Sequence, residues 1–296
     1  MATRTQRGRP GRIGDTPAVR RTLVIAVVAI MILFVAAPVF VVISEAVSAG
    51  LGTAFRNLGA PDTRHAIWLT VLTALIAVPI NTVFGVAAAW AITKFTFPGR
   101  RLLMVVIEIP FSISPIVAGV SYLFVYGLQG LFGEALRDAD IRILFALPGI
   151  VLASMFVTAP FVARELIPLM QSQGTAQEEA ATSLGAGGLR TFFSITLPNI
   201  RWALLYGIVL CNARVMGEFG AVSVVSGHVR GQTNTLPLQI QLLYDDYNSA
   251  GAFAAASVLT VLAVFTLLAK VLLERRGAGR RLGHSPPAPP IEDVSA

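Results

Sequence analysis

The chain has 296 residues, of which 55% are hydrophobic and only 13% carry a charge. A mean hydropathy of +0.72 lies outside the range of soluble domains, so the composition excludes a soluble enzyme and indicates a membrane protein. The net charge of +7 does not point to nucleic acid, because membrane proteins gather basic residues on their cytoplasmic side. The single cysteine, Cys211, lies in an apolar run and excludes a disulfide framework.

Six segments are long and apolar enough to cross the hydrocarbon core, which takes about 20 residues in a helix. They predict an all-α polytopic membrane protein whose transmembrane domain covers residues 22–273. The predicted transmembrane helices lie at about residues 22–44, 65–93, 109–133, 143–163, 202–226 and 249–271. The flanking segments 1–21 and 274–296 are rich in Arg, Gly, Pro and Ser, and we expect both to be disordered cytoplasmic tails.

The distribution of basic residues predicts the orientation of these helices. If both termini lie in the cytoplasm, 17 of the 23 lysines and arginines are on the inner side of the membrane. This orientation predicts a multi-pass membrane protein with both ends of the chain in the cytoplasm. Residues 164–201 form its longest cytoplasmic loop.

The sequence carries no recognisable catalytic set. Its two lysines, Lys94 and Lys270, do not follow glycines, which excludes a phosphate-binding Walker loop. The histidines His65, His228 and His284 lack metal-ligand spacing, so we expect no metal site and no cofactor on this chain. Uphill transport by such a protein must draw its energy from an ion gradient or from a partner.

The long cytoplasmic loop contains the stretch EEAATSLGAGGLRTFFSITLPNI, residues 178–200. Thr175 followed by Glu178 is a capping-box pattern, which predicts a short helix beginning near Ala176. Gly185 provides the backbone freedom that ends a helix. Pro198 is expected to block helix continuation before the chain re-enters the membrane. The loop thus predicts a short exposed helix suited to docking with another protein.

This loop resembles the EAA motif of the permease subunits of type I ATP-binding-cassette (ABC) importers. The fixed positions of that motif fall here on Glu179, Ala180, Ala181, Gly185, Ile195, Leu197 and Pro198. The resemblance implies a MetI-like permease fold with six transmembrane helices, in which this segment is the coupling helix that docks on a partner ATPase. It also implies a second homologous permease, an external binding protein, and two copies of an ATPase subunit that holds ATP and magnesium.

Further stretches are similar to the oxyanion branch of this family. GEFGAVSVVSGHVRGQTNTLPLQI carries a Gly-Glu-Phe-Gly motif and a Thr-Leu-Pro element, and LYDDYNSAGAFAAAS is similar to permeases of sulfate/thiosulfate importers. The implied function is therefore ATP-driven translocation of sulfate or thiosulfate. A permease for molybdate, tungstate or another oxyanion is the alternative. A gradient-driven anion carrier or channel is more remote, because it needs no ATPase-docking loop.

Two charged residues, Arg214 and Glu218, interrupt the fifth predicted transmembrane helix. A charge near the centre of the membrane costs at least about 2.5 kcal/mol, so it requires a partner or water. The two residues are four apart and share one helix face, which fits a structural ion pair. Alternatively, Arg214 attracts an anion along its pathway. Glu108, at the start of the third predicted helix, is a second candidate partner for Arg214.

Overall fold

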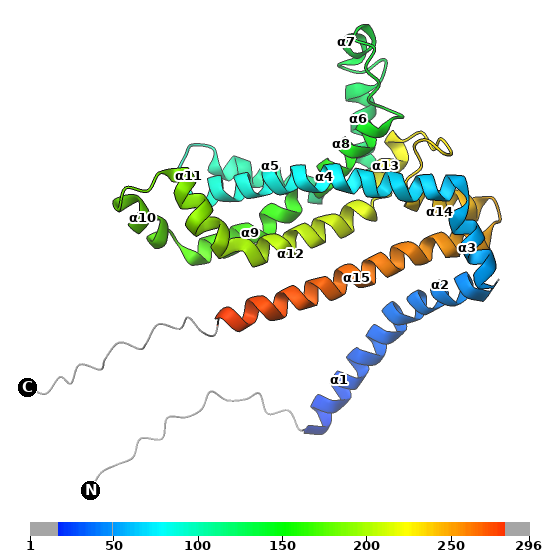
Figure 1. The fold of residues 1–296 in the computed structure, drawn as a ribbon, viewed down its shortest axis with the longest axis horizontal. Helices are drawn as coiled ribbons and strands as arrows, with labels where there is room; N and C mark the ends of the chain where they lie inside the picture. Colours follow the sequence, from blue (N-terminus) through cyan, green and yellow to red (C-terminus); the bar gives the residue numbers. More distant parts are fainter. Residues whose placement is uncertain (1–16, 49, 282–296) are drawn as a thin grey trace, which may run out of the picture.

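The computed structural model describes residues 17–48 and 50–281, and this part of the chain is an all-α bundle (Figure 1). The elements in chain order are α1 (Pro17–Met31), the π-helical segment η1 (Ile32–Ala36), α2 (Ala37–Ser48), α3 (Leu51–Gly59), α4 (Pro61–Lys94), α5 (Arg100–Ser112), α6 (Pro115–Tyr126), α7 (Gly133–Asp138), α8 (Leu147–Thr158), α9 (Pro160–Gln173), α10 (Ala176–Ser183), α11 (Gly188–Thr191), the π-helical segment η2 (Phe192–Thr196), α12 (Leu197–Met216), α13 (Gly220–Val225), α14 (Leu236–Asp245) and α15 (Ser249–Arg281).

The centre of the bundle is the three-way contact of α4, α9 and α12. Its largest apolar cluster joins side chains of all three helices, among them Ala77, Leu166 and Cys211, which are fully or almost fully buried. Asn81 of α4 ties in α8, because its amide donates to the Met155 carbonyl at 3.1 Å and to the Thr158 hydroxyl at 2.7 Å. The polar side chain of Asn81 is therefore an interhelical packing contact.

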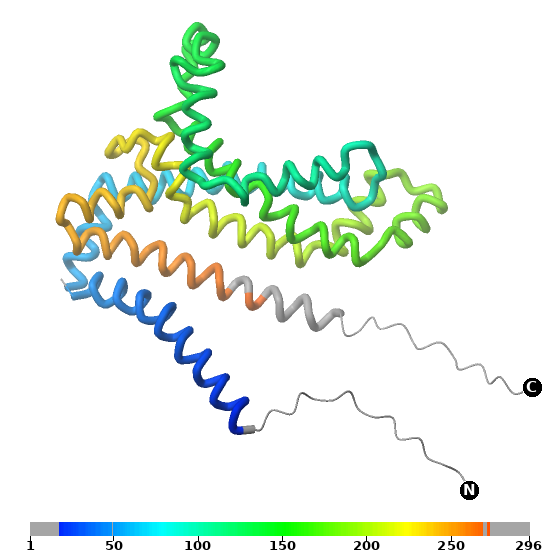
Figure 2. The backbone as a smooth tube through the Cα atoms, turned by 180° about the vertical axis from the view of Figure 1, so that it is seen from behind, coloured from blue at the N-terminus to red at the C-terminus, as the bar shows by residue number. Residues whose placement is uncertain are grey.

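The remaining long helices surround this centre unevenly. Helix α15 packs against α12, α14, α2 and α3, whereas α1 diverges from the bundle. Figure 2 shows the same divergence from behind. The end of α15 points toward the end of the molecule where the short helix α10 lies, and the first residues of α1 lie away from α3, on the side that faces that end (Figure 1). Helices α3 and α14 lie at the opposite end.

The third predicted transmembrane segment, 109–133, is not one straight helix. It is replaced by α5 and α6, whose axes differ by 108°. The helix ends at Ser112 and restarts with Pro115 at the first helical position, because proline lacks the amide that would continue the helix through 113–114. Helix α6 and the turns that carry α7 project away from the bundle as an arm (Figures 1 and 2).

The fourth predicted segment, 143–163, begins and ends too early. The helix runs from Leu147 to Gln173 through α8 and α9, so Arg164 lies on a membrane-length helix and not in a loop. Pro160 occupies the first turn of α9, where a proline is tolerated, and the helix ends at Gly174, which has φ +68°. The long loop predicted for 164–201 shrinks to the region around α10.

The fifth predicted segment, 202–226, also differs. The helix starts earlier, at Gly188, and continues to Met216. Pro198 does not interrupt it, because the π-helical turn η2 directly before α12 changes the hydrogen-bond register and accommodates the proline ring. The chain then breaks at 217–219, and α13 is a separate short helix.

The described residues contain five helices that can cross a membrane by length and composition, or six if the bent α5–α6 pair is counted as one span. The all-α, polytopic prediction is confirmed on this count. The predicted disordered tails, 1–21 and 274–296, extend too far into the chain, since residues 17–21 belong to α1 and 274–281 to α15. The expected disorder of 1–16 and 282–296 falls outside the described residues.

Gly85 marks the closest approach of α4 and α9. A Cβ atom on Gly85 would lie 2.6 Å from the Val162 Cβ and 3.0 Å from the Ala163 amide nitrogen. The two backbones can therefore meet only because residue 85 has no side chain.

We expect Gly85→Ala to destabilise the bundle by about 1–3 kcal/mol through overpacking. Gly52→Ala is the matched control, because Gly52 is also helical and a Cβ there meets no atom within 4 Å. The measurement is the thermal unfolding midpoint in detergent together with the amount of protein in the membrane. Equal behaviour of the two variants would contradict the close contact.

Candidate functional site

Helix α10 is the short exposed helix that the loop sequence predicts, and it begins at Ala176 as expected. The predicted capping box does not form. The Thr175 hydroxyl donates to the Glu179 carboxylate at 2.5 Å, and Thr175 makes no side-chain bond to a helix amide. Glu178 does not reach back to the N-cap because a lysine from another helix binds it.

That lysine is Lys94, the last residue of α4. Its ammonium group lies 2.8 Å from the Glu178 carboxylate, and the two side chains are only 6% and 18% exposed. Lys94 also donates to the Gly174 carbonyl, and the Thr196 hydroxyl donates to Glu178 at 3.1 Å. One carboxylate of α10 thus joins the end of α4 to η2, directly before α12.

A second contact fixes the other side of α10. The Asn199 amide, in the first turn of α12, donates to the Gln177 side-chain oxygen at 2.7 Å. Helix α10 is therefore attached to the two central helices α4 and α12 through side chains, although it shares little apolar contact with them. The sequence analysis overlooked Lys94 and Glu178 in this role, because residues 84 positions apart in the chain give no local signal.

Two opposing effects act on the pKa of Glu178. Partial burial alone would raise the pKa of its carboxyl group, but hydrogen bonding and charge attraction from Lys94, together with the Thr196 bond, leave the pKa below the ordinary 4.5. The carboxylate is thus more stable in the folded state. Its contribution to stability is fully present above pH 4.5 and is lost as the pH falls through the lowered pKa.

The positions of the EAA pattern occupy distinct environments around α10. Glu179 and Ala180 are exposed, Ala181 is half-buried, and Pro198 is exposed beside the half-buried Leu197 and Ile195. Gly185 has φ +86°, and a Cβ there would meet nothing within 4 Å. Its requirement for glycine is therefore conformational and not a matter of space inside this chain.

The tip of this segment carries apolar side chains that the sequence analysis did not single out. Leu184, at the end of α10, is 90% exposed, and Leu189, on α11, is 72% exposed. Leu184 lies outside the membrane-length helices, and Leu189 lies in the first turn of the helix that begins at Gly188. Large exposed apolar side chains at the tip of a loop are typical of a protein-docking surface. We call residues 176–189 the docking segment.

Arg214 and Glu218 form an ion pair at the end of α12. The Arg214 Nη1 and Glu218 Oε2 atoms are 2.5 Å apart, and the carboxylate side chain is 1% exposed, whereas the arginine is 33% exposed. The other carboxylate oxygen accepts from the Ala221 amide at 2.9 Å and caps α13. Glu218 therefore holds the break at 217–219 together, which favours the structural interpretation of this pair.

Glu108 does not fulfil the role considered for it. It is exposed on α5, and among the described residues it forms no ion pair with Arg214.

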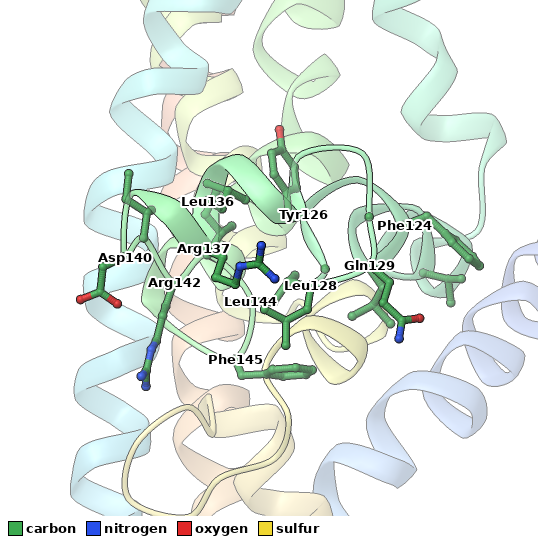
Figure 3. Close-up of a pocket in the computed structure, with 17 residues that line it drawn as sticks. Phe124, Tyr126, Leu128, Gln129, Leu136, Arg137, Asp140, Arg142, Leu144 and Phe145 are labelled. Carbon is green, nitrogen blue, oxygen red and sulfur yellow. The ribbon is translucent and has the colours of Figure 1, made fainter.

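The arm formed by α6 and α7 contains a hollow of about 860 Å³ (Figure 3). Apolar side chains such as Leu128, Leu144 and Phe145 wall it, and Arg137 reaches across it. Arg137 and Arg142 are outer-loop residues in the predicted topology. The hollow lies on the arm and not between the central helices, so we do not assign the transport pathway to it.

A bundle of membrane-length helices with two interrupted helices and an exposed short helix attached to its centre defines a polytopic membrane protein. Residues 81–278 match the family described as the inner membrane component of binding-protein-dependent transport systems. The chain belongs to this family, which confirms the predicted resemblance to the permease subunits of ABC importers and makes the chain a multi-pass inner membrane protein.

Curated relatives cover most of the chain. It is 55% identical over 239 residues to the sulfate transport system permease protein CysW of Escherichia coli, covering 81% of this chain and 82% of the relative. It is 49% identical to the protein of the same name from Synechocystis, covering 83% and 89%. It is 34% identical to the sulfate transport system permease protein CysT of Salmonella typhimurium, covering 76% and 81%.

A solved structure supports the fold. A chain from a bacterial ABC transporter involved in the import of the acidic polysaccharide alginate superposes with a TM-score of 0.71 at 16% sequence identity. The superposition covers 87% of this chain and 96% of that chain. At this identity the likeness shows the permease fold and nothing about the substrate.

We expect Lys94→Met and Glu178→Gln each to loosen α10, since removal of one partner leaves the other charge half-buried and unpaired. A local cost of about 1–2 kcal/mol corresponds to hydrogen exchange at least about fivefold faster in residues 176–183. The double variant should exchange no faster than the worse single variant, because both changes remove the same interaction. Arg190→Ala, an exposed position nearby, is the control. Unchanged exchange in Lys94→Met would show that the pair does not hold the helix.

Proposed function

We propose that this chain is the membrane-spanning permease subunit of an ATP-driven ABC importer that carries sulfate or thiosulfate across the bacterial cytoplasmic membrane. The observation that carries the proposal is the 55% identity to a sulfate permease over 81% of the chain. The relatives called CysW and CysT are both sulfate permeases by name. The chain itself is a transport subunit, and the ATP is hydrolysed by a partner.

The tethered docking segment suits this division of labour. Helix α10 presents Glu179 and Leu184 outward while Glu178 is bound to Lys94 from within. An ATPase bound to this segment would transmit its movement to α4 through the Lys94–Glu178 ion pair and to α12 through the Asn199–Gln177 hydrogen bond. We propose that the EAA-pattern residues form the coupling surface, and that two ATPase copies with ATP and magnesium act on the importer.

Two further partners complete the proposed importer. A second homologous permease supplies the other half of the pore, because one chain leaves the faces of α5 and α6 exposed. An external binding protein delivers the anion. A related solved structure is described as an alginate ABC transporter in complex with a ligand-bound periplasmic protein, which supports a partner of this kind.

We place both termini in the cytoplasm. Support comes from the excess of basic residues on that side and from the position of the first and last helices, whose terminal ends point toward the same end of the molecule as α10 (Figure 1). An ATPase must meet α10 in the cytoplasm, where ATP is available.

A permease for molybdate or tungstate is the alternative within this class, and a gradient-driven carrier or channel lies outside it. The deciding experiment is uptake of labelled sulfate by cells whose own sulfate permease is deleted and replaced by this chain with its partner subunits. We expect uptake that is reduced by excess unlabelled thiosulfate and that stops when ATP is depleted while the ion gradient is held. Competition by molybdate alone would favour the alternative substrate, and uptake without ATP would favour a carrier.

The backbone of Gly185 gives a sharper test of the coupling surface. Gly185→Val should abolish uptake and release the ATPase, because a β-branched residue cannot hold φ +86° without strain. Gly185→Asn should retain more of both, since asparagine tolerates positive φ better than other side chains. Thr182→Ala should be nearly silent, because the Thr182 hydroxyl bonds only carbonyls of its own helix. Copurification of the ATPase and membrane abundance are measured alongside uptake.

Equal loss in the valine and asparagine variants would mean that contact with the partner, and not backbone conformation, explains the glycine. Full uptake with Gly185→Val would remove the coupling interpretation of this segment.

The proposed orientation predicts which positions react with an impermeant thiol reagent in intact cells. In a Cys211→Ser background, cysteines at Thr5 and Gly283 should be shielded. A cysteine at Tyr247, whose side chain is 94% exposed in the turn before α15, should label. Labelling at either end of the chain would overturn this topology.

A further inference from the structure

Arg164 is a charged residue on a membrane-length helix, and it belongs to none of the ion pairs among the residues that the structure describes. It lies on α9 within the span Leu147–Gln173, and its side chain is exposed in the single chain. Among the described residues no carboxylate oxygen lies within ion-pair distance of it, in contrast to Arg214. Its contact is the ring of Phe111, whose centroid lies 4.9 Å from the guanidinium carbon.

Arg164 lies too far from the end of α9 for its guanidinium group to extend into the cytoplasm. The residue lies nine positions before the end of α9, which corresponds to about 14 Å of helix. Phe111 lies eleven positions beyond the start of α5, or about 16 Å from that cytoplasmic end. The guanidinium group therefore points sideways toward Phe111 on α5, at about the same distance from the helix ends as Arg164 itself. An arginine near a helix end that avoids lipid would instead extend along the helix toward the membrane surface.

Phe111 is also the residue before the last of α5, directly below the 108° bend into α6. The second helix break, at 217–219, lies against the same bend. A Cβ on Gly220 would come within 2.9 Å of the Pro115 Cβ, at the first turn of α6. Phe111, which Arg164 contacts, thus lies directly before the first break, and the second break packs against Pro115 on the other side of that bend.

Such breaks are informative in a membrane, because non-helical backbone at this depth is tolerated only where protein buries it or where it lines a water-filled cavity. In secondary transporters, discontinuous helices form the substrate sites. An exposed arginine on a membrane-length helix requires water or a counter-charge for the same reason. The face of α5 and α9 that carries Arg164 therefore does not lie against lipid.

We propose that Arg164 lines the cytoplasmic half of the translocation route and contacts the passing anion, a doubly charged tetrahedral oxyanion such as sulfate. The proposal rests on the proposed function for the nature of the ligand. Phe111 holds the guanidinium in place through the ring face. Glu108, one turn from Phe111 on α5 and also exposed, adds a negative charge to this face and keeps the anion from binding too tightly to leave.

The test uses the complete importer with its ATPase and binding protein. Arg164→Ala should lower the rate of labelled sulfate uptake at least about tenfold while membrane abundance and ATPase copurification stay at the wild-type level, and Arg164→Lys should retain more of the rate. Arg201→Ala is the matched control. Arg201 is also exposed and lies 5.4 Å from the ring of Trp202, but it sits at the start of α12, away from the breaks, so uptake should not change.

A second experiment separates an aqueous route from a protein interface. In the Cys211→Ser background, Arg164→Cys in inside-out vesicles should react with water-soluble methanethiosulfonates. A reagent that attaches an ammonium group should restore at least half of the uptake rate, and one that attaches a sulfonate should not. Labelling does not depend on the substrate, so it reports the route even if the wild-type importer proves to carry another anion.

Three results would overturn the proposal. The first is uptake by Arg164→Ala at the wild-type rate. The second is failure of water-soluble reagents to reach a cysteine at this position. The third is loss of the second permease from the purified complex, which would show that Arg164 pairs with a partner chain.

Discussion

The hydrocarbon core of a membrane offers neither hydrogen bonds nor counter-charges, and this constraint organises the whole chain. Several polar side chains on the long helices therefore find partners within the fold. The Thr70 hydroxyl donates to the Ala66 carbonyl and accepts from the Leu236 amide, which ties the outer loop to α4. Asn81 bridges α4 and α8. Arg164 forms no ion pair within the part of the chain that the structure describes, so water or another chain must supply its counter-charge.

The same constraint explains why the two helix breaks lie together. A break exposes backbone amides and carbonyls, and Glu218 satisfies one of these groups at the start of α13 while it binds Arg214. Gly119 and Gly220 allow α6 and α13 to approach so closely that added Cβ atoms would meet backbone or side-chain atoms at 2.8 and 2.9 Å. The ion pair at the end of α12 therefore stabilises the non-helical backbone at 217–219, and part of the Arg214 side chain remains exposed.

The end of the molecule that carries α10 depends on charge in a different way. Outside the hydrocarbon core an ion pair between exposed side chains contributes little, but Lys94 and Glu178 are largely shielded, and a threonine and a backbone carbonyl complete their hydrogen bonds. The pair attaches a small helix with few apolar contacts to the two most central helices. This attachment leaves Glu179 on α10 and Leu184 directly after it exposed, which is compatible with the proposed coupling surface.

The sequence by itself determined the membrane class, the all-α fold, the approximate positions of the long helices, and the exposed helix beginning at Ala176, because hydropathy and the EAA pattern are local properties of the chain. It did not determine where helices continue or break. Pro198 resembled a stop signal but is accommodated by a π-helical turn, and 109–133 resembled one span but bends by 108°. It also did not reveal that Glu178 binds Lys94 or that Arg164 faces Phe111. Only the tertiary structure decided these points, since each depends on which distant helix lies alongside, and packing outweighs the local preferences that a sequence displays.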